Sequence, residues 1–193
     1  MDRPLIGSTG LSKGQAWFAA TLSQGDRLCL NCTDDTVMDS SHIILRLGKA
    51  CDAQTIALLS RELIEPGLGW SWTPSRVLGS IHQPDTITLV AAAQQQLIGF
   101  AIMYFGQEQA HLDLLAVRPS HQRRGLGRRL LEWLEKSART AGIVAIFLEL
   151  RTTNIGAHCF YQRLGFRDSA FLPGYYGGRE AAIRMVRKLR VVR

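Results

Sequence analysis

Three short apolar runs in close succession constrain the fold of this chain more than any other feature. They cover residues 86–92, 97–105 and 110–117, and the segments between them have the length of hairpin loops. Strands joined by such short connections must be antiparallel, because a parallel crossover needs a dozen or more residues. The middle of the chain is therefore predicted to form an antiparallel meander.

The spacing of apolar residues changes after the meander. They recur at every fourth position, as Leu126, Leu130, Leu134 and Ala138. This spacing predicts an amphipathic helix, and Gly142 is placed to end it. Further elements are predicted as a strand over 143–150, a helix over 154–164 and strands over 166–176 and 181–189.

Two helices and a strand are predicted before the meander. The strand covers 42–47, and the first helix begins at Asp52 as N-cap and ends at Pro66-Gly67. The second helix has Thr73 as its cap and Pro74 at its first position. Together these elements predict one α/β (α+β) domain, with a mixed, mostly antiparallel sheet of six or seven strands and about four helices.

Residues 1–41 have little periodicity and are rich in Gly, Ser, Thr and Asp, so they are predicted to be a poorly patterned extension of a domain at 42–193. The 193 residues are 46% hydrophobic and 20% charged, which excludes a fibrous or wholly disordered protein. The chain lacks an apolar run of membrane-spanning length and a signal-peptide pattern at its start, which favours a cytoplasmic protein.

The four cysteines and the net charge exclude few classes of function. Cys29 and Cys32 form a C-x-x-C, but Cys51 and Cys159 are isolated, so ordinary thiols are favoured over a zinc or redox site. No metal is expected. The net charge of +7 implies acidic partners, which include nucleic acid, a ribosome-associated substrate and a phosphorylated cofactor.

A basic, glycine-containing loop lies between the last meander strand and the following helix, in the sequence Gln122-Arg123-Arg124-Gly125-Leu126-Gly127-Arg128-Arg129. Free N–H groups at a helix start favour phosphate, and glycines allow a pyrophosphate to approach the main chain. A solvated basic helix start is the simpler alternative. The dinucleotide fingerprint is disfavoured because its third glycine is replaced by Leu130 and the loop is too long.

The same loop resembles the Q/R-x-x-G-x-G/A signature of the GNAT superfamily of N-acetyltransferases. A second block, Leu148-Glu149-Leu150-Arg151-Thr152-Thr153-Asn154 followed by Tyr161-Gln162-Arg163-Leu164-Gly165-Phe166, is similar to that of protein N-terminal acetyltransferases. Among these, the chain resembles the bacterial ribosomal-protein alanine acetyltransferases of the RimI type. The segment Tyr175 to Met185 is similar to their ending, and the resemblance covers about residues 43–190.

This resemblance implies acetyl-CoA as cofactor and a set of residues that hold it. Residues 122–128 would bind the pyrophosphate. The main chain of Leu115, Ala116 and Val117 would bind the pantetheine arm and polarise the thioester carbonyl. Asn154 would contact the cofactor and Tyr161 would point at its sulfur. Asn154, His158 and Tyr161 are predicted to share one helix face, with Ala157, Phe160 and Leu164 on another.

Two residues are candidates for proton transfer. Glu149 matches the position of the base that takes a proton from the amine, directly or through water, and Tyr161 that of the acid. The alternative for Glu149 is an exposed carboxylate paired with Arg151, two residues further along the strand. Tyr161 could instead be a packing residue, and His158 is either a substitute proton carrier or a structural histidine.

The acceptor is less constrained than the cofactor. By resemblance, Trp70, Trp72, Tyr175 and Tyr176 would form the walls of its site. The chain departs from the ribosomal-protein enzymes in a shorter segment between Tyr176 and Glu180 and in Ala181, which replaces an acidic residue. These departures weaken the assignment to an alanine N-terminus. The resemblance favours a protein N-terminal amine, with a small amine (polyamine, amino acid or aminoglycoside) as the rival. A basic nucleic-acid-binding module is disfavoured because no aromatic residue lies within 121–129.

Overall fold

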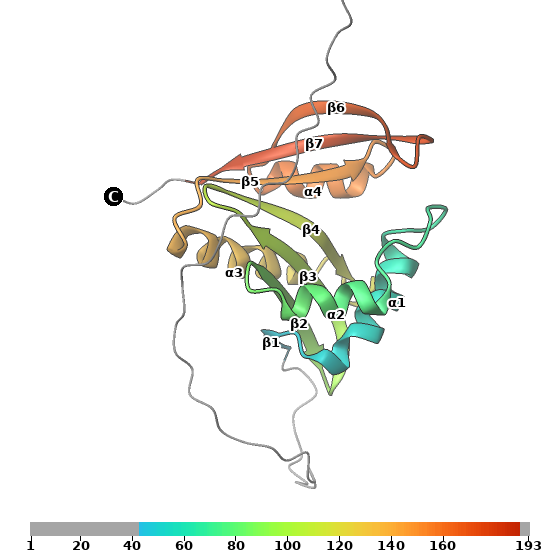
Figure 1. The fold of residues 1–193 in the computed structure, drawn as a ribbon, viewed down its shortest axis with the longest axis vertical. Helices are drawn as coiled ribbons and strands as arrows, with labels where there is room; N and C mark the ends of the chain where they lie inside the picture. Colours follow the sequence, from blue (N-terminus) through green and yellow to red (C-terminus); the bar gives the residue numbers. More distant parts are fainter. Residues whose placement is uncertain (1–42, 190–193) are drawn as a thin grey trace, which may run out of the picture. The chain divides into compact units, whose positions relative to one another are not determined.

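A computed structural model describes residues 43–189, in which seven strands and four α-helices follow the predicted order (Figure 1). The extension at 1–41 and the C-x-x-C at Cys29 lie outside the described residues. The elements are β1 (Ile44–Leu47), η1 (Ala50–Asp52), α1 (Ala53–Leu63), α2 (Pro74–His82), β2 (Thr86–Ala93), β3 (Gln96–Phe105), β4 (Gln109–Val117), η2 (Pro119–His121), α3 (Leu126–Thr140), β5 (Ala145–Arg151), α4 (Ile155–Arg163), β6 (Arg167–Tyr176) and β7 (Glu180–Lys188).

The strands form one sheet in the order β1-β2-β3-β4-β5-β7-β6. Each neighbouring pair is antiparallel except β4 and β5, which confirms the mixed, mostly antiparallel sheet and its central meander. The first hairpin turns at Gln94 and Gln95, whose positive φ angles of 47° and 64° suit the tight turn of a twisted β-hairpin.

The parallel pair β4 and β5 is short. It covers only Gln109–His111 on β4 and Ala145–Phe147 on β5, so the carboxyl-terminal halves of these two strands do not pair with each other. Figure 1 shows the two strands close together at one end and apart at the other. Main-chain groups on the facing edges of both strands are therefore left for other partners.

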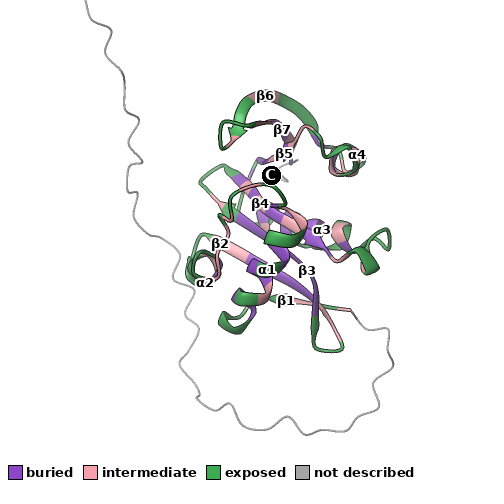
Figure 2. Cartoon of the chain, turned by 90° about the vertical axis from the view of Figure 1, so that its right-hand side faces the viewer, coloured by how far each residue is buried: buried purple, intermediate pink, exposed green. Residues whose placement is uncertain are grey.

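Helices cover both faces of the sheet (Figure 2). Alternate residues of β2 point to opposite faces, so that Leu89 belongs to the core beneath α3 and Val90 to the core beneath α1 and α2. The stripe predicted for α3 is buried, with Leu130 and Leu134 fully inaccessible. Within residues 43–189, none of the helices combines the length and apolar composition that a lipid bilayer requires.

The predicted helix starts differ in how they are capped. Thr73 Oγ1 accepts from the main-chain N–H of Arg76, as predicted for α2. Asp52 is at the N-cap of α1 but its side chain does not cap that helix. Its carboxylate accepts instead from Arg46 on β1 at 2.6 Å and from the N–H of Lys49, which precedes the 3-10 turn, at 2.7 Å.

The two faces predicted for α4 were assigned wrongly. Tyr161 is buried in the same core cluster against which Ala157, Phe160 and Leu164 pack. Its ring meets those of Phe160 and Phe166 edge to face at 5.1 and 5.4 Å between centroids. Asn154 is the exposed N-cap of α4, so it does not share the burial of Tyr161. Burial of the aromatic ring outweighs the polarity of its single hydroxyl.

Candidate active site

Glu149 lies on β5 at the point where β4 and β5 separate, and only 4% of its side chain is exposed. Its Oε1 accepts from Arg184 Nε at 2.7 Å, and its Oε2 is 2.5 Å from His111 Nε2. Arg184 is directly opposite Glu149 in the β5–β7 register. Arg151 pairs with Glu180 instead, so the alternative of an exposed Glu149–Arg151 pair is wrong.

Two basic partners keep the Glu149 carboxylate ionised. Burial alone would raise the pKa of Glu149, but the hydrogen bonds from His111 and Arg184 outweigh it and hold the pKa below its usual value. The Glu149 carboxylate is therefore bound from both neighbouring strands, by His111 on β4 and by Arg184 on β7.

His111 and Asp113 are site residues that the sequence did not indicate. His111 Nδ1 is 2.7 Å from Asp113 Oδ1, on the same face of β4, while its Nε2 faces Glu149. The hydrogen bonds to Asp113 and Glu149 raise the pKa of His111 to about 9. The i, i+2 spacing of His111 and Asp113 was the available signal, but a histidine beside an aspartate is not specific on its own.

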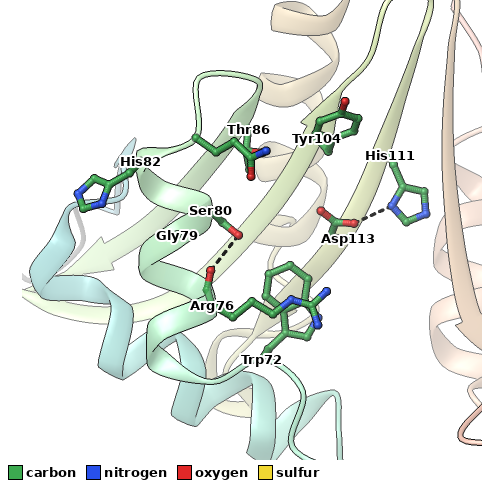
Figure 3. Close-up of a pocket in the computed structure, with 10 residues that line it drawn as sticks. Trp72, Arg76, Gly79, Ser80, His82, Thr86, Tyr104, His111 and Asp113 are labelled. Carbon is green, nitrogen blue, oxygen red and sulfur yellow. Dashed lines mark hydrogen bonds and ion pairs between the residues drawn. The ribbon is translucent and has the colours of Figure 1, made fainter. Parts of the chain in front are cut away.

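Two cavities of about 680 and 610 Å³ meet at Tyr104 and His111. Figure 3 shows the first, with Trp72 and Arg76 stacked on one side and His111 bonded to Asp113 on the other. The Arg76 guanidinium is 4.1 Å from the centre of the Trp72 ring. The second cavity is lined by Tyr104, Gly106, Gln107, Glu108, Gln109, Ala110, His111, Phe147, Glu149 and Arg184.

The four aromatic residues predicted for the acceptor site lie in different places. Trp72 lines the first cavity, whereas Trp70 is partly buried against the core of α1 and α2, beneath the guanidinium of Arg61. Tyr175 and Tyr176 pack edge to face near the end of β6. The pKa of Tyr175 is raised mainly by burial and secondly by the negative charge of the nearby Glu149 carboxylate.

The loop between α1 and α2, which carries Trp72, is fastened at two points. Glu65 is buried and accepts from the N–H and the hydroxyl of Ser71 at 2.8 and 2.6 Å. Arg151 on β5 donates to the carbonyl of Pro66 at 2.8 Å while it pairs with Glu180. The wall of the first cavity is therefore tied both to its own helix and to the far half of the sheet.

Tyr161 and His158 differ in their surroundings. Burial raises the pKa of the Tyr161 phenol, so the hydroxyl stays protonated throughout the neutral range. His158 bonds to Asp168 on β6 at 2.8 Å. That contact ties α4 to the edge of the sheet and favours the structural role over the proton carrier.

The start of α3 suits an anionic ligand. No side chain caps it, and Gly125 at the N-cap has a φ of 78°, a conformation that side chains disfavour. A Cβ on Gly127 would be 3.3 Å from the ring of Phe160, so this glycine lets α3 approach α4. Gln122 donates to the carbonyl of Val117 at 2.8 Å and holds the loop against the end of β4.

The arginines of this loop have different partners. Arg123 and Arg124 are exposed, and Arg123 has a φ of 62°. Arg128 pairs with Glu132 at 2.6 Å, one helical turn further on. Free N–H groups, the positive end of the helix dipole and exposed guanidinium groups together fit a diphosphate.

Replacing Gly125 with Ala is expected to lower the free energy of unfolding by about 1–2 kcal/mol, because an L side chain is strained at this φ. Thermal or denaturant unfolding measures this. Gly156→Ala in α4 is the matched control: it introduces no contact shorter than 3.9 Å and should be neutral or stabilising by at most about 1 kcal/mol. Equal effects of the two substitutions would contradict the assigned turn.

Within residues 43–189 no group of three or more His, Cys, Asp or Glu side chains is arranged to hold a metal ion. Cys51 and Cys159 are free thiols.

Comparison with known proteins assigns this chain to a family. The model of the Acetyltransferase (GNAT) family matches residues 57–166, more than half of the chain. The [ribosomal protein bS18]-alanine N-acetyltransferase of Salmonella typhimurium strain LT2 is 39% identical over 102 residues, which are 51% of this chain and 69% of that protein. The corresponding Escherichia coli K12 enzyme is 39% identical over 93 residues, or 47% of this chain and 63% of that protein.

Solved structures agree with the sequence matches. The ribosomal-protein-S18-alanine N-acetyltransferase from Escherichia coli aligns with a TM-score of 0.69 at 25% identity, over 79% of this chain and 97% of that one. The chain belongs to the GNAT family of acetyltransferases, whose acyl donor is acetyl-CoA.

Proposed function

We propose that the chain acetylates the α-amino group at the N-terminus of a protein or peptide. The observation that carries this proposal is the ionised Glu149 carboxylate where β4 and β5 separate, beside two cavities that meet at His111. The two cavities together give room for several residues of a peptide chain. The relatives named above act on an alanine of a ribosomal protein, which supports an N-terminal amine.

The cofactor would be held by two parts of the chain. The loop and first turn of α3 would bind the diphosphate, through Gln122, Arg123, Arg124, Gly125, Leu126, Gly127 and Arg128. Leu115, Ala116 and Val117 lie on β4 beyond the last residue paired with β5. Main-chain groups on the edge that faces β5 would therefore be available to the pantetheine arm, except the Val117 carbonyl, which accepts from Gln122. The side chain of Asn154 accepts from the N–H of Ala157, so its own N–H donors would face the cofactor.

Acetyl-CoA supplies the acetyl group as an activated thioester. Glu149 would take the proton from the acceptor ammonium, directly or through a water molecule, because an amine must be neutral to attack. Tyr161 would give a proton to the departing sulfur. Trp72, Tyr175 and Tyr176 would line the path of the acceptor, and Trp70 would support the loop that holds Trp72.

Acetyl-CoA turnover against a panel of N-terminal tetrapeptides, with a matched panel of polyamines, amino acids and aminoglycosides, tests the function. Thiol release is expected with a subset of the peptides, and mass spectrometry should place the acetyl group on the α-amine. Blocking that amine should abolish turnover. Selective turnover of small amines would replace this proposal with the rival one, and salt-dependent RNA binding without any transfer would reject both.

A further inference from the structure

We propose that His111 is a positioning residue whose doubly protonated ring bridges Asp113 and Glu149 and thereby holds the Glu149 carboxylate ionised and fixed in the cleft. The inference deepens the proposed function and rests on its assignment of Glu149 as the base. Neither the family match nor the sequence pattern assigns a role to His111 or Asp113.

The geometry determines the protonation of the ring. Both nitrogens of His111 are at hydrogen-bond distance from carboxylate oxygens, at 2.7 Å for Asp113 and 2.5 Å for Glu149. Ionised carboxylates only accept, so each nitrogen must donate and the ring must carry both protons. A neutral ring would leave one nitrogen lone pair facing a carboxylate.

The bridge limits the movement of Glu149. One carboxylate oxygen is bound by Arg184 from β7 and the other by His111 from β4, on opposite sides of the gap in the sheet. Because β4 and β5 share no ladder beyond His111 and Phe147, this side-chain bond is the next link between the strands after the last main-chain pair. Its loss would free Glu149 to turn toward Arg184 alone.

The bridge is also open to the acceptor. The side chains of His111 and Asp113 are 35% and 26% exposed, against 4% for Glu149, and His111 lines both cavities. Other charged or titratable groups facing this region come from four elements and the β3–β4 turn: Arg76 and His82 on α2, Tyr104 on β3, Glu108 in the turn, Tyr175 on β6 and Arg184 on β7.

The pH dependence of kcat tests the proposal. At saturating acceptor, wild-type kcat is expected to fall as the pH rises through about 9, where His111 loses a proton and the bridge opens. His111→Gln should lower kcat at pH 7 by about 10- to 100-fold, the size expected for a lost hydrogen bond to a charged group, and should lack this fall.

Asp113→Asn separates a positioning role from a purely structural one. With one carboxylate removed, His111 should lose its proton at lower pH, so the fall in kcat should move from about 9 toward the ordinary histidine pKa of 6.5. His158→Gln is the matched control, because it removes a histidine paired with a single carboxylate on β6 and should leave the profile unchanged. A deficit in His111→Gln that is equal at every pH would overturn the proposal.

NMR titration of the His111 ring gives a readout that needs no acetyl transfer. The wild-type ring should titrate near 9, and Asp113→Asn and Glu149→Gln should each lower that value. A wild-type value near 6.5 would sink the proposal even if the enzyme acetylates peptides. If no acceptor is found, the proposed function fails while this titration still decides the role of His111.

Discussion

Glu149→Gln is expected to lower kcat by roughly 10²–10⁴-fold, the usual size of a general acid–base contribution. The amide has nearly the shape of the carboxylate and can still accept from Arg184, but it cannot take a proton from the acceptor. Steady-state thiol release with the best acceptor measures the loss. Since the pKa of Glu149 lies below its usual value, the loss should be similar at all pH values from 6 to 8.

The control for this substitution is Glu180→Gln. Glu180 also pairs with an arginine on a neighbouring strand, Arg151, but lines neither cavity. It should keep kcat within a few-fold of wild type. Wild-type kcat in Glu149→Gln would reject Glu149 as the base.

Stability provides a second check on Glu149. A carboxyl group whose pKa is lower in the folded state than in the unfolded state stabilises the fold at pH values above its unfolded-state pKa. This stabilisation is lost as the pH falls through the folded-state pKa. Wild type should therefore lose more stability than Glu149→Gln when the pH is lowered below about 4.5. Unfolding curves at pH 7 and in mild acid would show the difference.

Tyr161→Phe is expected to lower kcat by roughly 10²–10⁴-fold with little change in fold. The phenylalanine ring can keep the edge-to-face contacts with Phe160 and Phe166, so only the hydroxyl is lost. Burial raises the pKa of Tyr161, which keeps the phenol protonated throughout the neutral range.

Binding and stability measurements separate chemistry from packing at Tyr161. Calorimetry should show coenzyme A binding to Tyr161→Phe with an affinity close to that of wild type, and the melting temperature should be nearly unchanged. A variant with normal kcat would show that Tyr161 only packs the core. A variant that loses coenzyme A binding would show that the Tyr161 hydroxyl contributes to binding of the cofactor.

The local elements of this domain could be predicted because their signals lie within short windows of sequence. Apolar spacing marked the meander and α3, and Thr73 with Pro74 marked the start of α2. Errors arose where local rules compete with tertiary contacts. Asp52 has the right position for a cap, yet its carboxylate binds Arg46 on β1. Tyr161 was predicted on a polar helix face, yet its aromatic ring is buried in the core.

The sequence by itself determined the order of the elements, the uncapped glycine start of α3 and the identity of Glu149 as a candidate base. Only the tertiary structure decided the partners of that base. His111 is 38 residues and Arg184 35 residues away from Glu149 along the chain, and the register of three strands brings them together. Local periodicity carries no information about such register, because it depends on pairing between strands that are distant in sequence.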